Sequence, residues 1–309
     1  MVLIIALYAL FGASFPIMKV LVGQAPHAFL VGCRMTIAGL LLLSYQYFHP
    51  KEEFRFHKKH WFWYVQITFF GVYLTYMLRF WALNYMPSSK MSFLFNLSPF
   101  MSSYYSYLFF KEKMTKKQWL GLFIGFMGLI PVLITTSKSE SCFGEFAYIS
   151  WPEIAVILAV ALHSYSWIVM RKLVREKSYS PLMINGISMT CGGIMGLITS
   201  YAAETAPAIN DPFTFWGFLI LIIVTSNIIC HNLYGFLLKQ YTATFISFAG
   251  FLGPIFTAIY GYLFLKETIT WHYFVSGTIV FIGLWLFYQD ELGKKQPAPF
   301  DTQVEGDLE

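Results

Sequence analysis

Charged residues are scarce in this chain. Asp, Glu, Lys and Arg make up only 12% of its 309 residues, whereas ordinary soluble domains contain about 25%. Hydrophobic residues account for 57% and aromatic residues for 20%. This composition argues against a soluble globular protein and predicts an all-α integral membrane protein, because runs of about 20 apolar residues are typical of membrane-spanning helices.

Cysteines are also few, and none is placed as a paired site requires. The four, Cys33, Cys142, Cys191 and Cys230, show no CxxC pattern, and all but Cys142 lie inside apolar runs. We therefore expect no disulfide framework, no metal site and no cofactor.

Acidic residues are missing from the middle of the apolar runs. All 16 Asp and Glu residues lie in loops, in tails or at the ends of runs, so no intramembrane carboxylate is available for a simple proton relay. The chain also lacks paired carboxylates, a His–Asp arrangement of suitable spacing and a phosphate-binding loop. These absences argue against an enzyme such as a lipid-modifying transferase.

The net charge of +5 is distributed unevenly along the chain. Alternate loops and the C-terminal tail contain 15 Lys and Arg residues, and the opposite set contains three. An excess of basic residues marks cytoplasmic loops, where they face anionic lipid headgroups. We therefore expect both termini in the cytoplasm, with the lipid bilayer and not nucleic acid as the partner of this charge.

Apolar runs long enough to span a membrane occur ten times, which predicts ten transmembrane helices. They cover approximately residues 2–22, 27–49, 61–83, 88–110, 117–136, 153–173, 181–203, 213–237, 242–265 and 270–289.

A pattern within residues 99–128 recurs at residues 254–283, always 155 positions later. The matching pairs include Pro99 and Pro254, Tyr105 and Tyr260, Lys111 and Lys266, Glu112 and Glu267, and Gly128 and Gly283. A single ungapped spacing over this length indicates a tandem duplication, and such repeats define the architecture.

Each copy holds five predicted helices, an odd number, so the second copy must enter the membrane from the opposite side. We expect a first repeat at 1–136, an external linker at 137–152, a second repeat at 153–289 and a disordered cytoplasmic tail at 290–309. Inverted repeats are typical of secondary transporters, in which the halves rock around a site at the membrane midplane.

The Tyr-Leu-Phe-x-Lys-Glu pattern ends a helix in both halves and precedes a glycine-containing helix. In this the chain resembles the drug/metabolite transporter superfamily, and most closely its EamA-type ten-helix carriers. The resemblance implies a central cavity lined by the first four helices of each repeat, with the fifth helices at the periphery. The sequence departs from many relatives at Gly12 to Phe15, where they have a Trp-Gly pair, so no relative's ligand contacts are carried over.

Two arginines lie inside the predicted helices, where a charge costs about 2.5–3.5 kcal/mol on insertion scales. Arg34 lies about seven residues into the second run, roughly 10 Å deep. It is a candidate ligand for a substrate carboxylate or phosphate; alternatively, it is a structural arginine. Arg79 is a second candidate, although it lies one turn from the end of its run and can reach the membrane surface.

Several uncharged residues are further candidates for substrate binding. They are His163 with Trp167 on the same helical face, the i, i+4 pair Asn227 and His231, Asn96 in a polar stripe, and the aromatic Tyr76. Such residues also serve as packing contacts between helices, and this alternative stays open for each.

Pro99 and Pro254 interrupt the helical hydrogen bonding at matching positions of the two repeats. Broken helices at corresponding positions indicate a transport site, and a packing kink is the alternative.

Together these features predict a secondary transporter that moves a small, carboxylate-bearing organic metabolite across the inner membrane by alternating access. Some EamA-type carriers of obligate intracellular bacteria exchange S-adenosylmethionine for S-adenosylhomocysteine, and this resemblance gives the most specific expectation. Amino-acid or drug efflux, with proton coupling through His163, is the alternative. A homodimer is compatible with the sequence.

Overall fold

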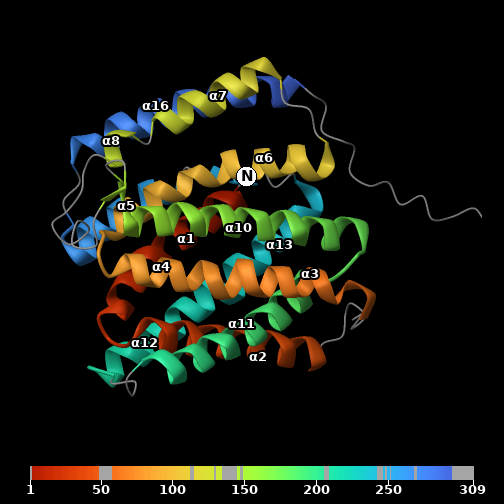
Figure 1. Ribbon diagram of the computed structural model, residues 1–309, viewed down its shortest axis with the longest axis vertical. Coiled ribbons are helices and arrows are strands. Elements are labelled where there is room, and N and C mark those ends of the chain that lie inside the picture. The colour runs from red at the N-terminus through yellow and green to blue at the C-terminus, as the bar shows by residue number, and fades with distance from the viewer. Residues whose placement is uncertain are drawn as a thin grey trace, which may run out of the picture.

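The computed structural model is a bundle of helices (Figure 1). The residues that the structure describes are 2–48, 58–111, 115–128, 130–133, 145–146, 149–204, 209–241, 246–247, 249–250, 252–267 and 270–293. Most of the predicted linker, the tail and Glu112 lie outside them.

The first half of the chain contains α1 (Val2–Val22), α2 (His27–Phe48), η1 (Lys58–His60), α3 (Trp61–Gln66), η2 (Ile67–Leu74), α4 (Thr75–Leu83), α5 (Ser88–Leu94), η3 (Phe95–Leu97), α6 (Ser98–Phe110), α7 (Lys116–Met127) and α8 (Ile130–Leu133). The second half contains β1 (Glu145–Phe146), β2 (Ile149–Ser150), α10 (Trp151–Glu176), α11 (Pro181–Ala203), α12 (Pro212–Ile222), η4 (Ile223–Cys230), α13 (His231–Gln240), α15 (Leu252–Tyr260), η5 (Gly261–Leu265) and α16 (Trp271–Gly293). The two short strands pair antiparallel just before α10.

Five helices of the described residues are long and apolar enough to cross a membrane. They are Leu3–Val22, His27–Phe48, Trp151–Glu176, Pro181–Ala203 and Pro212–Lys239. The all-α membrane class is confirmed, whereas the ten spans, the inverted repeats and the cytoplasmic termini stay predictions.

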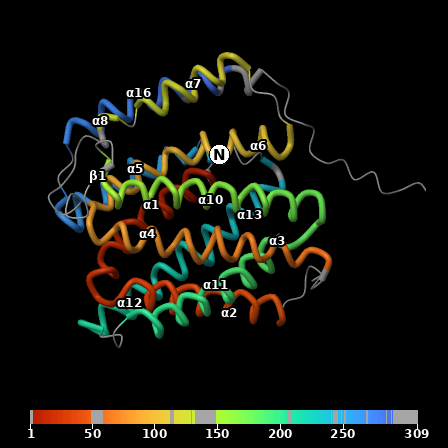
Figure 2. Tube along the Cα trace, viewed as in Figure 1, coloured from red at the N-terminus to blue at the C-terminus, as the bar shows by residue number. Residues whose placement is uncertain are grey.

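Helices far apart in the sequence pack side by side (Figures 1 and 2). The helices α7 and α16 lie together at one edge of the bundle, and α2 and α11 lie together at the opposite edge. Between these edges, α1 packs on α15, and α10 packs on α4 and α6. In the predicted repeats, α1 corresponds to α10, and α6 corresponds to α15. The α1–α15 contact is therefore the counterpart of the α10–α6 contact, so the packing follows the sequence repeat.

Glycine permits the closest of these approaches. A Cβ atom on Gly39 of α2 would collide with the backbone nitrogen of Thr190 on α11, and one on Gly121 of α7 would collide with the carbonyl of Gly283 on α16. Small residues at such crossings let helix backbones approach closely in membrane proteins.

Two π-helical segments occupy corresponding places in the two halves. One is η2, which lies between α3 and α4, and the other is η4, which lies between α12 and α13. In each, a side chain at its C-terminal end donates to the carbonyl five residues earlier: Thr75 Oγ1 to Phe70 O at 2.7 Å and His231 Nδ1 to Ser226 O at 2.7 Å. Such segments are often found at functional sites.

The two repeat prolines follow tighter turns. The 3₁₀ segment η3 ends two residues before Pro99, which lies in the first turn of α6. Before Pro254, the backbone makes two i to i+3 hydrogen bonds, from Gly250 N to Ser247 O and from Gly253 N to Gly250 O. Each proline therefore follows a tightened turn, because its missing N–H and its ring disfavour a continuous α-helix.

The Lys-Glu loops share a second backbone feature. Lys111 and Lys266 follow α6 and η5, and both have φ of 53°. A left-handed residue commonly ends a helix.

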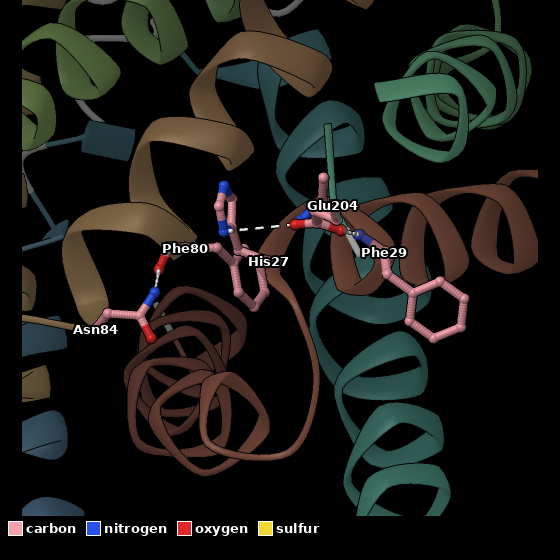
Figure 3. Close-up of polar contacts among 6 residues, drawn as sticks. His27, Phe29, Phe80, Asn84 and Glu204 are labelled. Atoms are coloured by element: carbon pink, nitrogen blue, oxygen red, sulfur yellow. Dashed lines mark hydrogen bonds and ion pairs between the residues drawn. The ribbon is translucent and has the colours of Figure 1, made fainter. Parts of the chain in front are cut away.

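Carboxylates fix several helix ends. Glu204, just after α11, accepts hydrogen bonds from the backbone N–H groups of Ala28 and Phe29 at 2.8 and 3.0 Å and lies 3.6 Å from His27 Nδ1 (Figure 3). Glu267 likewise accepts from the N–H groups of Ser88 and Ser89 at the start of α5. These contacts satisfy helix donors that otherwise have no partner.

Asp211 caps the start of α12 by accepting from the backbone N–H of Phe213. The hydroxyl of Thr214 and the neighbouring backbone N–H groups also donate to this carboxylate, and they lower its pKa. The cap therefore fixes the helix end while Asp211 is ionised.

Candidate functional site

A cavity lies where the two halves of the chain meet. Its walls come from α1, α4 and the α5–α6 run of the first half, and from α10, η4, α13, the segment before α15 and the start of α15 in the second half. None of its described lining residues is Asp or Glu, and Arg79 is the lining residue with a permanent positive charge. The cavity therefore suits a ligand with an anionic group.

The lining residues occur in pairs that occupy equivalent repeat positions, 155 apart. Six such pairs line it: Tyr8 and His163, Gly12 and Trp167, Arg79 and Tyr234, Ser92 and Ser247, Phe95 and Gly250, and Ser98 and Gly253. The two halves thus present different side chains at five of these six matching places, and serine at the sixth.

Arg79 enters this cavity from α4 through a cage of aromatic rings. Its guanidinium carbon lies 4.4 Å from the ring centre of Phe95, 5.1 Å from that of Phe15 and 5.0 Å from that of Tyr76. The residue is only 6% exposed, and its Nε has no hydrogen-bond partner in the described structure. The expectation that Arg79 reaches the membrane surface is wrong, because three aromatic faces hold the cation inside.

Behind Arg79, a hydrogen-bonded chain connects the two halves. The Tyr76 hydroxyl lies 2.9 Å from His231 Nε2, and His231 Nδ1 lies 2.7 Å from the carbonyl of Ser226. A carbonyl oxygen only accepts, so Nδ1 carries a proton. The Tyr76 hydroxyl donates to Nε2 of a neutral imidazole and accepts from Nε2 of a protonated one, so this bond is compatible with either protonation state of His231.

Arg34 lies on α2 and contacts the cavity-lining residue Ser226. Its Nε donates to Asn227 Oδ1 at 2.7 Å and its Nη2 to Ser226 Oγ at 3.0 Å. Its guanidinium carbon lies 5.0 Å above the centre of the Tyr76 ring, and the residue is 1% exposed. Arg34 does not line the cavity, although Ser226 does.

An aromatic cluster forms the wall contributed by the second half. Trp167 stacks on Tyr234 with ring centres 4.0 Å apart, and its indole N–H donates to His163 Nε2 at 2.9 Å. His231 lies 5.7 Å from Trp167 and 6.3 Å from His163 between ring centres. This wall offers flat apolar surface with few free polar groups, which suits a planar ring.

Hydroxyl groups bond one another between the helices that line the cavity. Ser92 Oγ lies 2.9 Å from Thr257 Oγ1, and Thr257 donates to the carbonyl of Gly12. Ser247 contacts both Ser102 and Tyr234, at 3.2 and 3.0 Å. The first two bonds join α5, α15 and α1, and the contacts of Ser247 join α6 to α13.

The structure divides the predicted site residues into two groups. Arg79, His163, Trp167, His231 and Pro254 line the cavity. The others do not line it: Arg34 and Tyr76 contact its lining residues, Asn227 bonds Arg34, Asn96 is buried in η3, and Pro99 lies in the first turn of α6. Pro99 and Pro254 are therefore not equivalent with respect to the cavity.

Sequence reasoning missed a buried ion pair between α5 and α10. Lys90 Nζ lies 2.7 Å from Glu153 Oε1, and their side chains are only 1% and 0% exposed. Both residues lie at the starts of predicted runs, 88–110 and 153–173, where the sequence predicts a loop or a helix end and not a buried charge. Tyr8 and Tyr234 were also missed, although the repeat spacing pairs them with His163 and Arg79.

No group of three His, Cys, Asp or Glu residues that could hold a metal ion occurs within the described ranges. Cys33, Cys191 and Cys230 are free thiols, and the predicted lone Cys142 lies outside the described residues.

Comparison with known proteins bears on the function of this cavity. The chain matches the EamA-like transporter family over residues 1–134 and 150–289. It is 30% identical over 286 residues to the S-adenosylmethionine/S-adenosylhomocysteine transporter of Chlamydia muridarum (strain MoPn / Nigg), which covers 91% of this chain and 89% of that protein. The protein of the same name from Chlamydia trachomatis serovar L2 is 29% identical over 91% of this chain and 86% of its own length.

More distant relatives extend the comparison. An uncharacterized transporter of Buchnera aphidicola subsp. Schizaphis graminum is 27% identical, over 91% of this chain and 88% of that protein. A solved crystal structure superposes with a TM-score of 0.67 over 92% of this chain and 96% of its own, at 13% identity. The latter supports the fold alone.

Proposed function

The chain belongs to the EamA-like transporter family, and we propose that it exchanges S-adenosylmethionine for S-adenosylhomocysteine across the inner membrane by alternating access. That it is an integral membrane transporter and not an enzyme follows from its family and its relatives. One observation carries the proposal: Arg79, whose buried Nε has no hydrogen-bond partner among the described residues, lines a cavity that has no carboxylate among its described lining residues. The names of the two chlamydial relatives supply the substrate pair.

The two walls suit different parts of such a substrate. We place its carboxylate at Arg79, where charge-assisted hydrogen bonds are strong. Its adenine fits the aromatic wall of Trp167, Tyr234 and the two histidines, since stacked aromatic rings favour a planar partner. The carboxylate and the ring would then be held by different halves of the chain, so that both halves sense one substrate.

Alternating access needs two halves that exchange roles. Three observations support an inverted repeat here: the helix contacts follow the repeat, six cavity pairs are 155 residues apart, and Lys111 and Lys266 share one backbone conformation. The family match over 1–134 and 150–289 nearly coincides with the two predicted repeats.

Exchange is favoured over proton-driven transport by the hydrogen bond of one cavity histidine. His163 Nε2 accepts from the indole N–H of Trp167, which only donates, so a protonated His163 could not make this bond, and no described lining residue is a carboxylate. Amino-acid or drug efflux, with proton coupling, is the second candidate; the aromatic wall, which accepts many planar ligands, favours it.

Uptake of labelled S-adenosylmethionine into vesicles containing the purified protein tests the proposal. We expect vesicles preloaded with unlabelled S-adenosylhomocysteine to accumulate label faster than empty vesicles, and a protonophore to leave the rate unchanged. Absence of any stimulation by the internal compound, or collapse under the protonophore, would favour the second candidate. Analytical ultracentrifugation of the same preparation tests the predicted homodimer.

A further inference from the structure

We propose that Arg34 is a positioning residue: it fixes the cavity wall made by Ser226 and His231 and does not itself contact the substrate. The inference rests on the proposed function of the cavity, and it assigns a role to a buried cation that the cavity does not include.

The contacts of Arg34 are directed at two neighbouring residues of the π segment. Its Nε donates to Asn227 and its Nη2 to Ser226, at 2.7 and 3.0 Å. A buried charge is costly unless its hydrogen bonds are made, and a guanidinium presents several donors in one rigid plane. Lysine, a point donor, cannot hold both acceptors in this geometry.

Ser226 is thereby held at both of its polar groups. Its hydroxyl oxygen accepts from Arg34, and its carbonyl accepts from His231 Nδ1. Asn227 is fully buried, and its amide nitrogen also contacts the sulfur atom of Met35, one position after Arg34. These contacts fix the wide turn of η4, whose residue Ser226 faces the cavity.

Arg34 reaches the same wall by a second route. Its guanidinium lies over the ring of Tyr76, which bonds His231 through its hydroxyl. Arg79 lies at the same distance, 5.0 Å, from the centre of that ring. Removing Arg34 would therefore loosen Ser226, His231 and Tyr76 together, and with them the wall that faces the substrate.

Ligand binding by folded Arg34→Gln protein separates positioning from direct contact. The probes are S-adenosylmethionine and its analogue with a carboxamide in place of the carboxylate. We expect the Kd of both to rise about five- to tenfold, the effect of roughly one lost hydrogen bond or slightly more. The matched variant Arg79→Gln should weaken the carboxylate compound and leave the carboxamide nearly unaffected.

Two results would overturn the proposal. A loss confined to the carboxylate compound in Arg34→Gln makes Arg34 a direct ligand. An unchanged Kd for both compounds, with only a lower melting temperature, makes it a purely structural residue. Arg34→Lys should restore part of the affinity, because it keeps the charge and one donor.

If the wild-type protein binds neither compound, the proposed function fails while the role of Arg34 stays testable. In a background without native cysteines, we expect Arg34→Gln to change the thiol-labelling rate of Tyr234→Cys, beside the His231 wall, about fivefold. The rate of Ser14→Cys, on the α1 wall, should not change. Equal rates at Tyr234→Cys with and without Arg34 would refute the positioning role.

Discussion

The Tyr76 hydroxyl and His231 Nε2 lie 2.9 Å apart, and the two residues are 155 positions apart in the sequence. This separation is the spacing of the internal repeat, so two equivalent positions contact each other directly. In the predicted inverted repeat, equivalent residues meet in this way only near the axis that would relate the halves. The same bond joins α4 and α13, which directly follow the π-helical segments η2 and η4.

Loss of this bond should affect transport more than stability. We expect Tyr76→Phe to reduce exchange about tenfold, because His231 Nε2 loses its hydrogen-bond partner and the ring is released beside Arg79. Tyr73→Phe is a matched control, since Tyr73 bonds Thr199 at 2.7 Å between η2 and α11 and does not line the cavity. Both variants should melt at similarly reduced temperatures in a thermal-shift assay, but only Tyr76→Phe should slow exchange in vesicles.

Arg79 should determine affinity for the anionic group. We expect Arg79→Gln to raise the KM for a carboxylate-bearing substrate about 10- to 100-fold, the loss typical of a hydrogen bond to a charged group. Initial exchange rates over a range of substrate concentrations measure this effect. Lys116→Gln, an exposed residue at the start of α7, is the control and should behave like the wild type. A normal KM for Arg79→Gln would exclude Arg79 from the binding site.

Removing one charge of the buried Lys90–Glu153 ion pair should destabilise the protein more than removing both charges. Glu153→Gln retains a hydrogen-bonding side chain for the Ser150 cap but removes the charge that Lys90 faces at 2.7 Å. We expect a loss of about 3–5 kcal/mol in unfolding free energy, because a lone charge stays buried.

The double variant Lys90→Met/Glu153→Gln should recover most of that loss, since neither charge then stays buried. Chemical denaturation in detergent measures the three proteins side by side. If the double variant is no more stable than Glu153→Gln, the cost does not come from an unbalanced charge at Lys90.

The family, the membrane class and the transporter assignment could be predicted from the sequence, because they depend on apolar length and on repeat spacing. Side-chain direction could not. Arg34 and Arg79 look alike in the sequence, yet Arg79 lines the cavity and Arg34 bonds Asn227 behind it. Lys90 and Glu153 each lie at the start of a predicted run. Their ion pair depends on a contact between α5 and α10, and such a contact leaves no pattern in the sequence around either residue.

Gly39 should be required for the close packing of α2 on α11. Gly39→Ala should destabilise the protein by about 1–3 kcal/mol, the usual cost of overpacking, because the new methyl group would collide with the Thr190 backbone. Gly217→Ala is the control, since a Cβ there meets nothing within 4 Å and alanine favours helix. Thermal unfolding should separate the two variants, and equal melting temperatures would contradict the tight α2–α11 crossing.

The side of the membrane on which each of the two Lys-Glu loops lies tests the inverted repeat. Lys111 and Lys266 are exposed and end matching helices with the same φ of 53°. Because five predicted helices separate equivalent positions, the inverted repeat predicts that these residues face opposite sides of the membrane. In a cysteine-free background, an impermeant maleimide should label Lys266→Cys in intact cells and Lys111→Cys only in inverted vesicles. Labelling of both from one side would rule out the inverted arrangement, and labelling of Lys111→Cys after detergent lysis verifies that its thiol is reactive.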